Sequence, residues 1–162
     1  MPRGVLILST ANSLADFRDQ RMNVRTFIKV DKATFHRFLE QNPEGQYDYV
    51  QGRIMQQMTG GTKRHMRIAA HIADLCKARL DPLEWLVLEG RGIETAVTIR
   101  HGDIVVEKQA EASDDSLWTA RPYLIFEVLS RWSEDRDLDL RPREYTTLDT
   151  LQAYVIADQH ER

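Results

Sequence analysis

The sequence predicts one mixed α/β domain over residues 26–162, preceded by an arm formed by residues 1–25. Three observations support this fold class. Two stretches have apolar residues at helical spacing, several short β-prone runs are separated by turn signals, and the run YLIFEVL at 123–129 is apolar on both faces apart from Glu127. A strand that is apolar on both faces belongs in the middle of a covered sheet. The expected architecture is therefore a central mixed β-sheet flanked by helices.

The first elements expected in this domain are a helix and a hairpin. Asp31 is placed as the N-cap of a helix whose apolar face includes Phe35, and the turn signal at 42–45 ends this helix. Two short strands within 47–55 then flank Gln51-Gly52, which predicts a hairpin.

A longer helix and a series of strands follow. Thr62 can cap a helix that runs to about Leu80, where Asp81-Pro82 ends it. Residues 108–121 are polar, which predicts a loop, and a second helical stretch lies within 133–148. Besides the central strand, the expected strands are 85–88, 93–99, 103–106 and 153–157.

Composition excludes several classes of protein. The single Cys76 rules out a disulfide framework and a Cys-rich zinc site. No apolar run approaches the roughly 18 residues of a membrane span, and the run at 4–8 is too short for a signal-peptide core. A cytoplasmic protein with no membrane contact is the expectation. Residues 102–162 hold 14 acidic and 7 basic residues, so this half is either a solvated surface or a place where carboxylates gather around a cation.

Glu127 and Asp103 are the strongest candidates for residues of a metal site. A carboxylate buried without a partner is costly, so Glu127 either meets a cation, binds a metal or faces water on an edge strand. Asp103 begins another apolar strand. Two carboxylates at the ends of neighbouring strands can hold Mg²⁺, which needs only one or two of them plus water and phosphate oxygens. A turn aspartate and a salt-bridged glutamate are the plainer alternative.

Six segments, in the right order and spacing, resemble the motifs of the Uma-two family of putative restriction endonucleases, which have the PD-(D/E)XK nuclease fold. The two most informative are Glu127-Val128-Leu129-Ser130 and the set Asp137, Arg141 and Tyr145 that follows it. The others are the hairpin YDYVQGRI at 47–54, His65 after Gly60-Gly61, the strand GDIVV at 102–106 and the strand LQAYVIAD at 151–158.

The resemblance implies a restriction endonuclease-like core and Mg²⁺- or Mn²⁺-dependent hydrolysis of DNA. It implies that Asp103, Glu127 and the backbone carbonyl of Val128 bind the metal, that Arg141 takes the place of the family's Lys, and that Asp48 and His65 support them. A homodimer is implied by analogy, because cutting both strands needs two sites. Members of the family usually continue into one more strand, so a C-terminal strand is expected to be absent here.

Arg141 is the main departure from the family pattern. A desolvated Lys can lose its proton, whereas Arg stays charged and cannot act as a general base. Arg141 can still orient a phosphate or stabilise charge in the transition state, although Pro142 biases it away from helical geometry. Two alternatives to a nuclease follow. One is a catalytically degenerate nuclease-fold protein that binds DNA or a protein partner without cleavage, and the other is an oligomerisation scaffold.

Several other polar residues have two interpretations each. Asp48 either extends the acidic cluster or faces water from its strand. His65 is either a hydrogen-bonded interior residue or a contact for phosphate or the attacking water. Asp137 is an N-cap or the partner of a nearby Arg. The basic cluster on the longer helix follows a nucleic-acid backbone or is the solvated face of an amphipathic helix; it consists of Lys63, Arg64 and Arg67, with Lys77 and Arg79 further along.

Overall fold

The computed structural model describes residues 29–57, 61–111, 115–129 and 136–159. The predicted arm, Ser130 and the side chain of Asp137 lie outside this set. The chain divides into two compact units, residues 1–58 and residues 59–162. The two units are described separately below.

The described part of the N-terminal unit is one helix with a hairpin. Helix α1 (Lys32–Gln41) begins as predicted at the N-cap Asp31, whose Oδ1 accepts the N–H of Thr34 at 2.7 Å. Aromatic rings join the helix to the hairpin. The rings of Phe38 and Tyr47 meet edge to face with centroids 4.8 Å apart, and those of Phe35 and Tyr49 lie 5.5 Å apart.

The hairpin lies where the Gln51-Gly52 signal predicted it. Strands β1 (Tyr47–Val50) and β2 (Arg53–Gln56) are antiparallel, and Val50 pairs with Arg53 across a two-residue turn. Gln51 has φ 50° and Gly52 has φ 89°. Positive φ at both central residues matches the twist of a hairpin, and glycine adopts it without steric cost.

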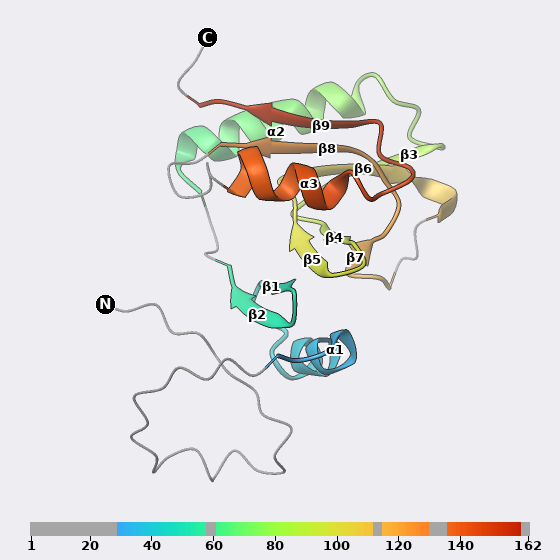
Figure 1. Ribbon diagram of the computed structural model, residues 1–162. Helices are drawn as coiled ribbons and strands as arrows, with labels where there is room; N and C mark the ends of the chain where they lie inside the picture. The colour runs from blue at the N-terminus through green and yellow to red at the C-terminus, as the bar shows by residue number, and fades with distance from the viewer. Residues whose placement is uncertain (1–28, 58–60, 112–114, 130–135, 160–162) are drawn as a thin grey trace, which may run out of the picture. The chain divides into compact units, whose positions relative to one another are not determined.

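The C-terminal unit is organised around a four-stranded mixed sheet in the order β3-β6-β8-β9 (Figure 1). Its strands are β3 (Trp85–Glu89), β6 (Ile104–Lys108), β8 (Pro122–Val128) and β9 (Ala153–Ala157). Strand β6 is antiparallel to β3 and β8, whereas β9 runs parallel to β8. The run at 123–129 therefore forms an interior strand, as its two apolar faces predicted.

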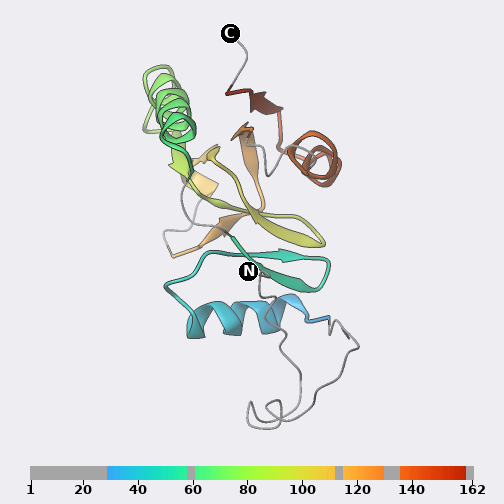
Figure 2. The same ribbon diagram turned by 90° about the vertical axis from the view of Figure 1, so that its left-hand side faces the viewer.

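Helices cover both faces of this sheet, and Figure 2 shows α2 and α3 on opposite sides of β8. Because side chains alternate along a strand, β6 and β8 supply residues to two cores. Ala69 and Ala73 of α2 (Lys63–Lys77) pack with Ile104 and Val128. On the other face, Tyr145 of α3 (Arg141–Tyr145) packs with Ile93, Val105 and Ile125.

The stretch 93–99 is two strands, so the prediction of a single strand there was wrong. Strand β4 (Gly92–Glu94) and strand β5 (Thr98–His101) form an antiparallel hairpin. The side-chain oxygen of Thr95 accepts the N–H groups of Val97 and Thr98, at 3.3 and 3.0 Å. Threonine offers the backbone this alternative to a strand ladder and so turns the chain.

Two further boundaries differ from expectation. The polar segment 108–121 contains the 3₁₀ turn Gln109–Glu111 and the short strand β7 (Trp118–Thr119), which pairs in parallel with β4. Helix α2 ends at Lys77 rather than near Leu80, because residues 78–80 tighten into bonds to Cys76 and Asp74. A π-helical turn, Arg136–Leu140, leads into α3. Within the described ranges, no helix has the length and hydropathy needed to cross a membrane.

Candidate active site

Asp103 and the end of β8 meet at one edge of the four-stranded sheet. Ile104, the first residue of β6, pairs with Phe126, so the preceding Asp103 lies beside the last residues of β8. The carboxylate Oδ2 of Asp103 accepts the backbone N–H of Val128 at 2.7 Å. This charge-assisted bond holds the carboxylate against the strand end.

Glu127 approaches the same edge. A Cβ built on Gly102, the residue before Asp103, would lie 3.5 Å from Oε1 of Glu127. The Glu127 carboxylate therefore lies close to Gly102, in the turn that precedes Asp103. The sequence-predicted residues Asp103, Glu127 and Val128 are thus gathered at one place by the pairing of β6 with β8.

His65 reaches this place from the first turn of α2. The hydroxyl of Thr62, the N-cap, accepts the N–H of His65 at 3.2 Å, which fixes the start of the helix. The imidazole Nε2 of His65 lies 3.1 Å from Oδ1 of Asp103, and the side chains are 18% and 25% exposed. His65 is therefore a hydrogen-bonded, largely buried residue whose partner is the candidate carboxylate itself.

Arg141 is the cationic partner of Glu127. Its Nη1 donates to Oε1 of Glu127, and the two side chains are 9% and 5% exposed. Of the three interpretations left open for Glu127, the edge strand is excluded because β8 is an interior strand. Pro142 does not break this corner, because it lies in the first turn of α3, where a missing N–H costs nothing.

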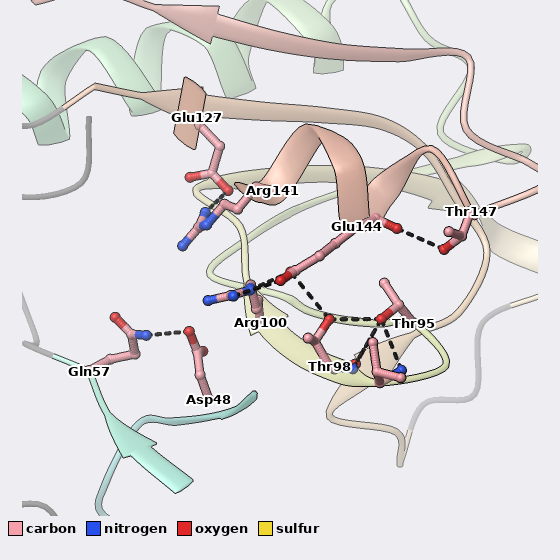
Figure 3. A network of polar contacts seen from close by, with 10 residues as sticks. Asp48, Gln57, Thr95, Thr98, Arg100, Glu127, Arg141, Glu144 and Thr147 are labelled. Atoms are coloured by element: carbon pink, nitrogen blue, oxygen red, sulfur yellow. Dashed lines mark hydrogen bonds and ion pairs between the residues drawn. The ribbon is translucent and has the colours of Figure 1, made fainter. Parts of the chain in front are cut away.

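A second buried ion pair, which the sequence did not reveal, also fixes α3 (Figure 3). Glu144 accepts two bonds from Arg100 of β5, with Nε to Oε2 at 2.5 Å and Nη2 to Oε1 at 2.8 Å. The hydroxyl of Thr98 donates to the same Oε2 at 3.4 Å. The only sequence signal for this pair is an arginine inside the strand run TIRH.

Helix α3 supplies the base of one ion pair and the acid of the other. Arg141 of α3 meets an acid on β8, whereas Glu144, three residues later, meets a base on β5. Residues three apart lie on the same side of a helix. Short helix α3 is therefore fixed on the sheet by two complementary charges, and this places the guanidinium of Arg141 against Glu127.

Asp48 belongs to the N-terminal unit. It is buried in β1 and accepts a hydrogen bond from the side-chain amide of Gln57, the residue after β2. A water-facing Asp48 is therefore wrong, because the side chain is covered. Its membership of the acidic cluster stays a prediction. Tyr145, by contrast, is a core residue, as expected, and its ring meets that of Tyr154 at 5.4 Å.

The donor set at the sheet edge fits a hard divalent cation by its chemistry. Asp103 and Glu127 supply carboxylates and Val128 supplies a backbone carbonyl, and Mg²⁺ is typically held by one or two carboxylates with water filling the other positions. No cluster of three or more His, Cys, Asp or Glu suited to a metal occurs among the described residues. Any metal here would therefore depend on few protein ligands.

Comparison with known proteins identifies the fold and the family of the chain. A solved structure similar to this chain is that of a putative nuclease of the family DUF820 from Anabaena variabilis ATCC 29413, with a TM-score of 0.55, 16% identity, and coverage of 71% of this chain and 67% of that chain. At that identity the likeness concerns the fold alone. No curated protein matches the chain. The model of the Uma2 family, described as "Putative restriction endonuclease", matches residues 33–162. The chain therefore belongs to the Uma2 family of putative restriction endonucleases.

Proposed function

We propose that this protein hydrolyses phosphodiester bonds in DNA with a Mg²⁺ or Mn²⁺ ion held by Asp103 and Glu127. The observation that carries the proposal is the placement of two carboxylates at one sheet edge, with Asp103 anchored to the N–H of Val128 at 2.7 Å. Family membership supplies the reaction class. A bound divalent ion would polarise a phosphoryl oxygen and lower the pKa of a water molecule.

The protein's own residues have distinct parts in this proposal. Val128 N–H and His65 Nε2 each hold one oxygen of Asp103, so its carboxylate keeps one orientation. Arg141 stays protonated at all relevant pH values. It therefore balances the charge of Glu127 and orients a phosphate, but it does not remove a proton from water.

A second candidate is a nuclease-fold protein that binds DNA or a protein partner without cutting. The buried ion pair between Glu127 and Arg141 favours it, because the guanidinium neutralises Glu127 without a metal. In that case Arg141 competes with the cation for the same carboxylate. The two candidates differ in whether a divalent ion binds and whether DNA is cut.

Cleavage of supercoiled plasmid with Mg²⁺ and with Mn²⁺ tests the proposal, together with calorimetric titration of Mn²⁺. The variants are Asp103→Asn, which keeps the side-chain shape, and Arg141→Lys, which restores the residue type of the family. Asp139→Asn is the matched control, since Asp139 is an exposed carboxylate paired with Arg143 at 2.7 Å on the surface.

The proposal predicts that the wild type and Asp139→Asn cleave the plasmid and bind Mn²⁺. It predicts that Asp103→Asn loses both cleavage and Mn²⁺ binding. If the wild type does not cleave the plasmid but Arg141→Lys does, the wild type is the non-cutting candidate and its metal site is intact. If no variant cleaves the plasmid and none binds Mn²⁺, the proposal of an enzyme is refuted and the oligomerisation scaffold remains. Light scattering of the wild type tests the homodimer that we propose for cutting both strands.

A further inference from the structure

The N-terminal half of α2 carries three cations that have no carboxylate partner among the described residues. They are Lys63, Arg64 and Arg67, all exposed. Arg64 Nη1 donates a hydrogen bond to the carbonyl of Gln159 at 3.4 Å, which leaves the positive charge without an acid.

Most other arginines of the C-terminal unit are neutralised. Five of them lie against acids: Arg91 with Glu107, Arg100 with Glu144, Arg121 with Glu111, Arg141 with Glu127 and Arg143 with Asp139. The last turn of α2 is balanced as well, because Lys77 Nζ lies 3.7 Å from Glu89. Among the described side chains of this unit, the largest group of neighbouring cations without a carboxylate partner therefore lies in the N-terminal half of α2.

The three cations lie in the same stretch of α2 as His65, a residue of the candidate active site. His65, which contacts Asp103 at 3.1 Å, is in the same helical turn. With a rise of 1.5 Å per residue, Lys63 and Arg67 are each about 3 Å from His65 along the helix axis. His65 is on the sheet-facing side with Ala69, whereas Lys63 and Arg67, four residues apart, share the outer side.

This arrangement is unfavourable for the free protein. Like charges at positions i and i+4 of a helix repel, and cations in a first turn oppose the helix dipole. The first turn of α2 has no acidic residue to offset them. Polyanions reverse both effects, because each phosphate that meets a cation releases condensed counterions.

We propose that Lys63, Arg64 and Arg67 bind the sugar-phosphate backbone of double-stranded DNA and hold the duplex beside Asp103 and Glu127. This inference rests on the proposed function for the choice of DNA. Such contacts position the nucleic acid and carry no sequence information. Binding through them is therefore salt-dependent and the same for any duplex sequence.

Fluorescence anisotropy of a labelled 30-base-pair duplex in EDTA tests the surface without cleavage. The test variant is Lys63→Gln/Arg67→Gln. Its matched control, Lys77→Gln/Arg79→Gln, removes the same charge from the last residue of α2 and from the turn that follows it. A third variant, Lys63→Arg/Arg67→Lys, keeps both charges. Melting temperatures confirm that all three fold.

Each phosphate contact contributes about 0.9 to the slope of log Kobs against log salt concentration. The test variant is expected to lower that slope by about 2, whereas the control and the charge-preserving variant keep the wild-type slope. Equal slopes in the test variant and its control would overturn the inference, as would a wild type that does not bind the duplex. These outcomes are independent of plasmid cleavage. If the test variant has the lower slope but the wild type does not cleave plasmid, only the nuclease is refuted. If the wild type cleaves plasmid but the test variant keeps the wild-type slope, only this surface is refuted.

Discussion

Substitution of Glu144 by Gln should destabilise the C-terminal unit strongly, because it removes one charge from a buried ion pair. Arg100 and Glu144 are 5% and 13% exposed and share two bonds, at 2.5 and 2.8 Å. Gln keeps one carbonyl acceptor but turns an NH₂ group toward a guanidinium donor. One charge-assisted bond, worth about 1.5–3 kcal/mol, is lost, and the charge of Arg100 is left uncompensated. Removing one partner of a buried pair costs about 3–5 kcal/mol, so we expect a loss near the lower end, about 3 kcal/mol.

Urea unfolding followed by circular dichroism measures this loss, with Asp139→Asn as the matched control. Asp139 also pairs with an arginine, Arg143 at 2.7 Å, but these side chains are 59% and 77% exposed. Exposed pairs at i, i+4 contribute only about 0.3–0.5 kcal/mol. If the two acid-to-amide changes shift the unfolding free energy by amounts within about 1 kcal/mol of each other, burial does not set the value of the inner pair and the reasoning is wrong. Adding Arg100→Met to Glu144→Gln should cost less than the sum of the two single changes, since both act on one interaction.

Three further predictions concern helix ends and the hairpin. Lys63→Glu should stabilise the protein by about 0.5–1 kcal/mol in thermal unfolding, because it favours the helix dipole and attracts Arg67, while it weakens DNA binding in anisotropy; lower stability would contradict this. The pKa of Asp31 lies below its usual value because Thr34 bonds its carboxylate through side chain and backbone. The ionised form therefore stabilises α1 above the usual pKa, and in pH-dependent melting the advantage of the wild type over Asp31→Asn should disappear as the pH falls through that lowered value; an advantage that persists in strong acid would refute the assignment. Gly52→Ala should cost about 1–2 kcal/mol in urea unfolding, because φ is 89° and the new Cβ would lie 2.9 Å from Cβ of Lys29; an unchanged midpoint would show that the turn relaxes freely.

Local signals in the sequence predicted most of the elements. Asp31 and Thr62 cap α1 and α2 where expected, and Gln51-Gly52 forms the predicted hairpin turn. These signals succeed because a cap or a tight turn depends on atoms a few residues apart. The error at 93–99 arose although its cause is also local. The turn made by Thr95 is local too, but it does not interrupt the β-prone character of the run.

The candidate site was only partly predictable. The anomaly of Glu127 in an apolar strand and its family motif pointed to Asp103, Glu127 and Arg141, and in the structure Arg141 bonds to Glu127 while Asp103 bonds to the N–H of Val128. Composition and spacing do not say which cation meets a buried carboxylate. The pairing of Arg100 with Glu144 joins residues 44 apart, and that of His65 with Asp103 joins residues 38 apart. Both contacts exist only after strands and helices have packed.

By itself, the sequence determined the starts of α1 and α2, the hairpin, the interior strand β8 and the family to which the chain belongs. The tertiary structure decided which charges meet. Burial makes an unpaired charge far more costly than an exposed one, so each acid or base carried into the interior must find a partner from another element. Those partners are determined by the register of β6 with β8 and by the packing of α2 and α3 on the sheet. The same packing leaves three exposed cations, Lys63, Arg64 and Arg67, without a partner among the described carboxylates.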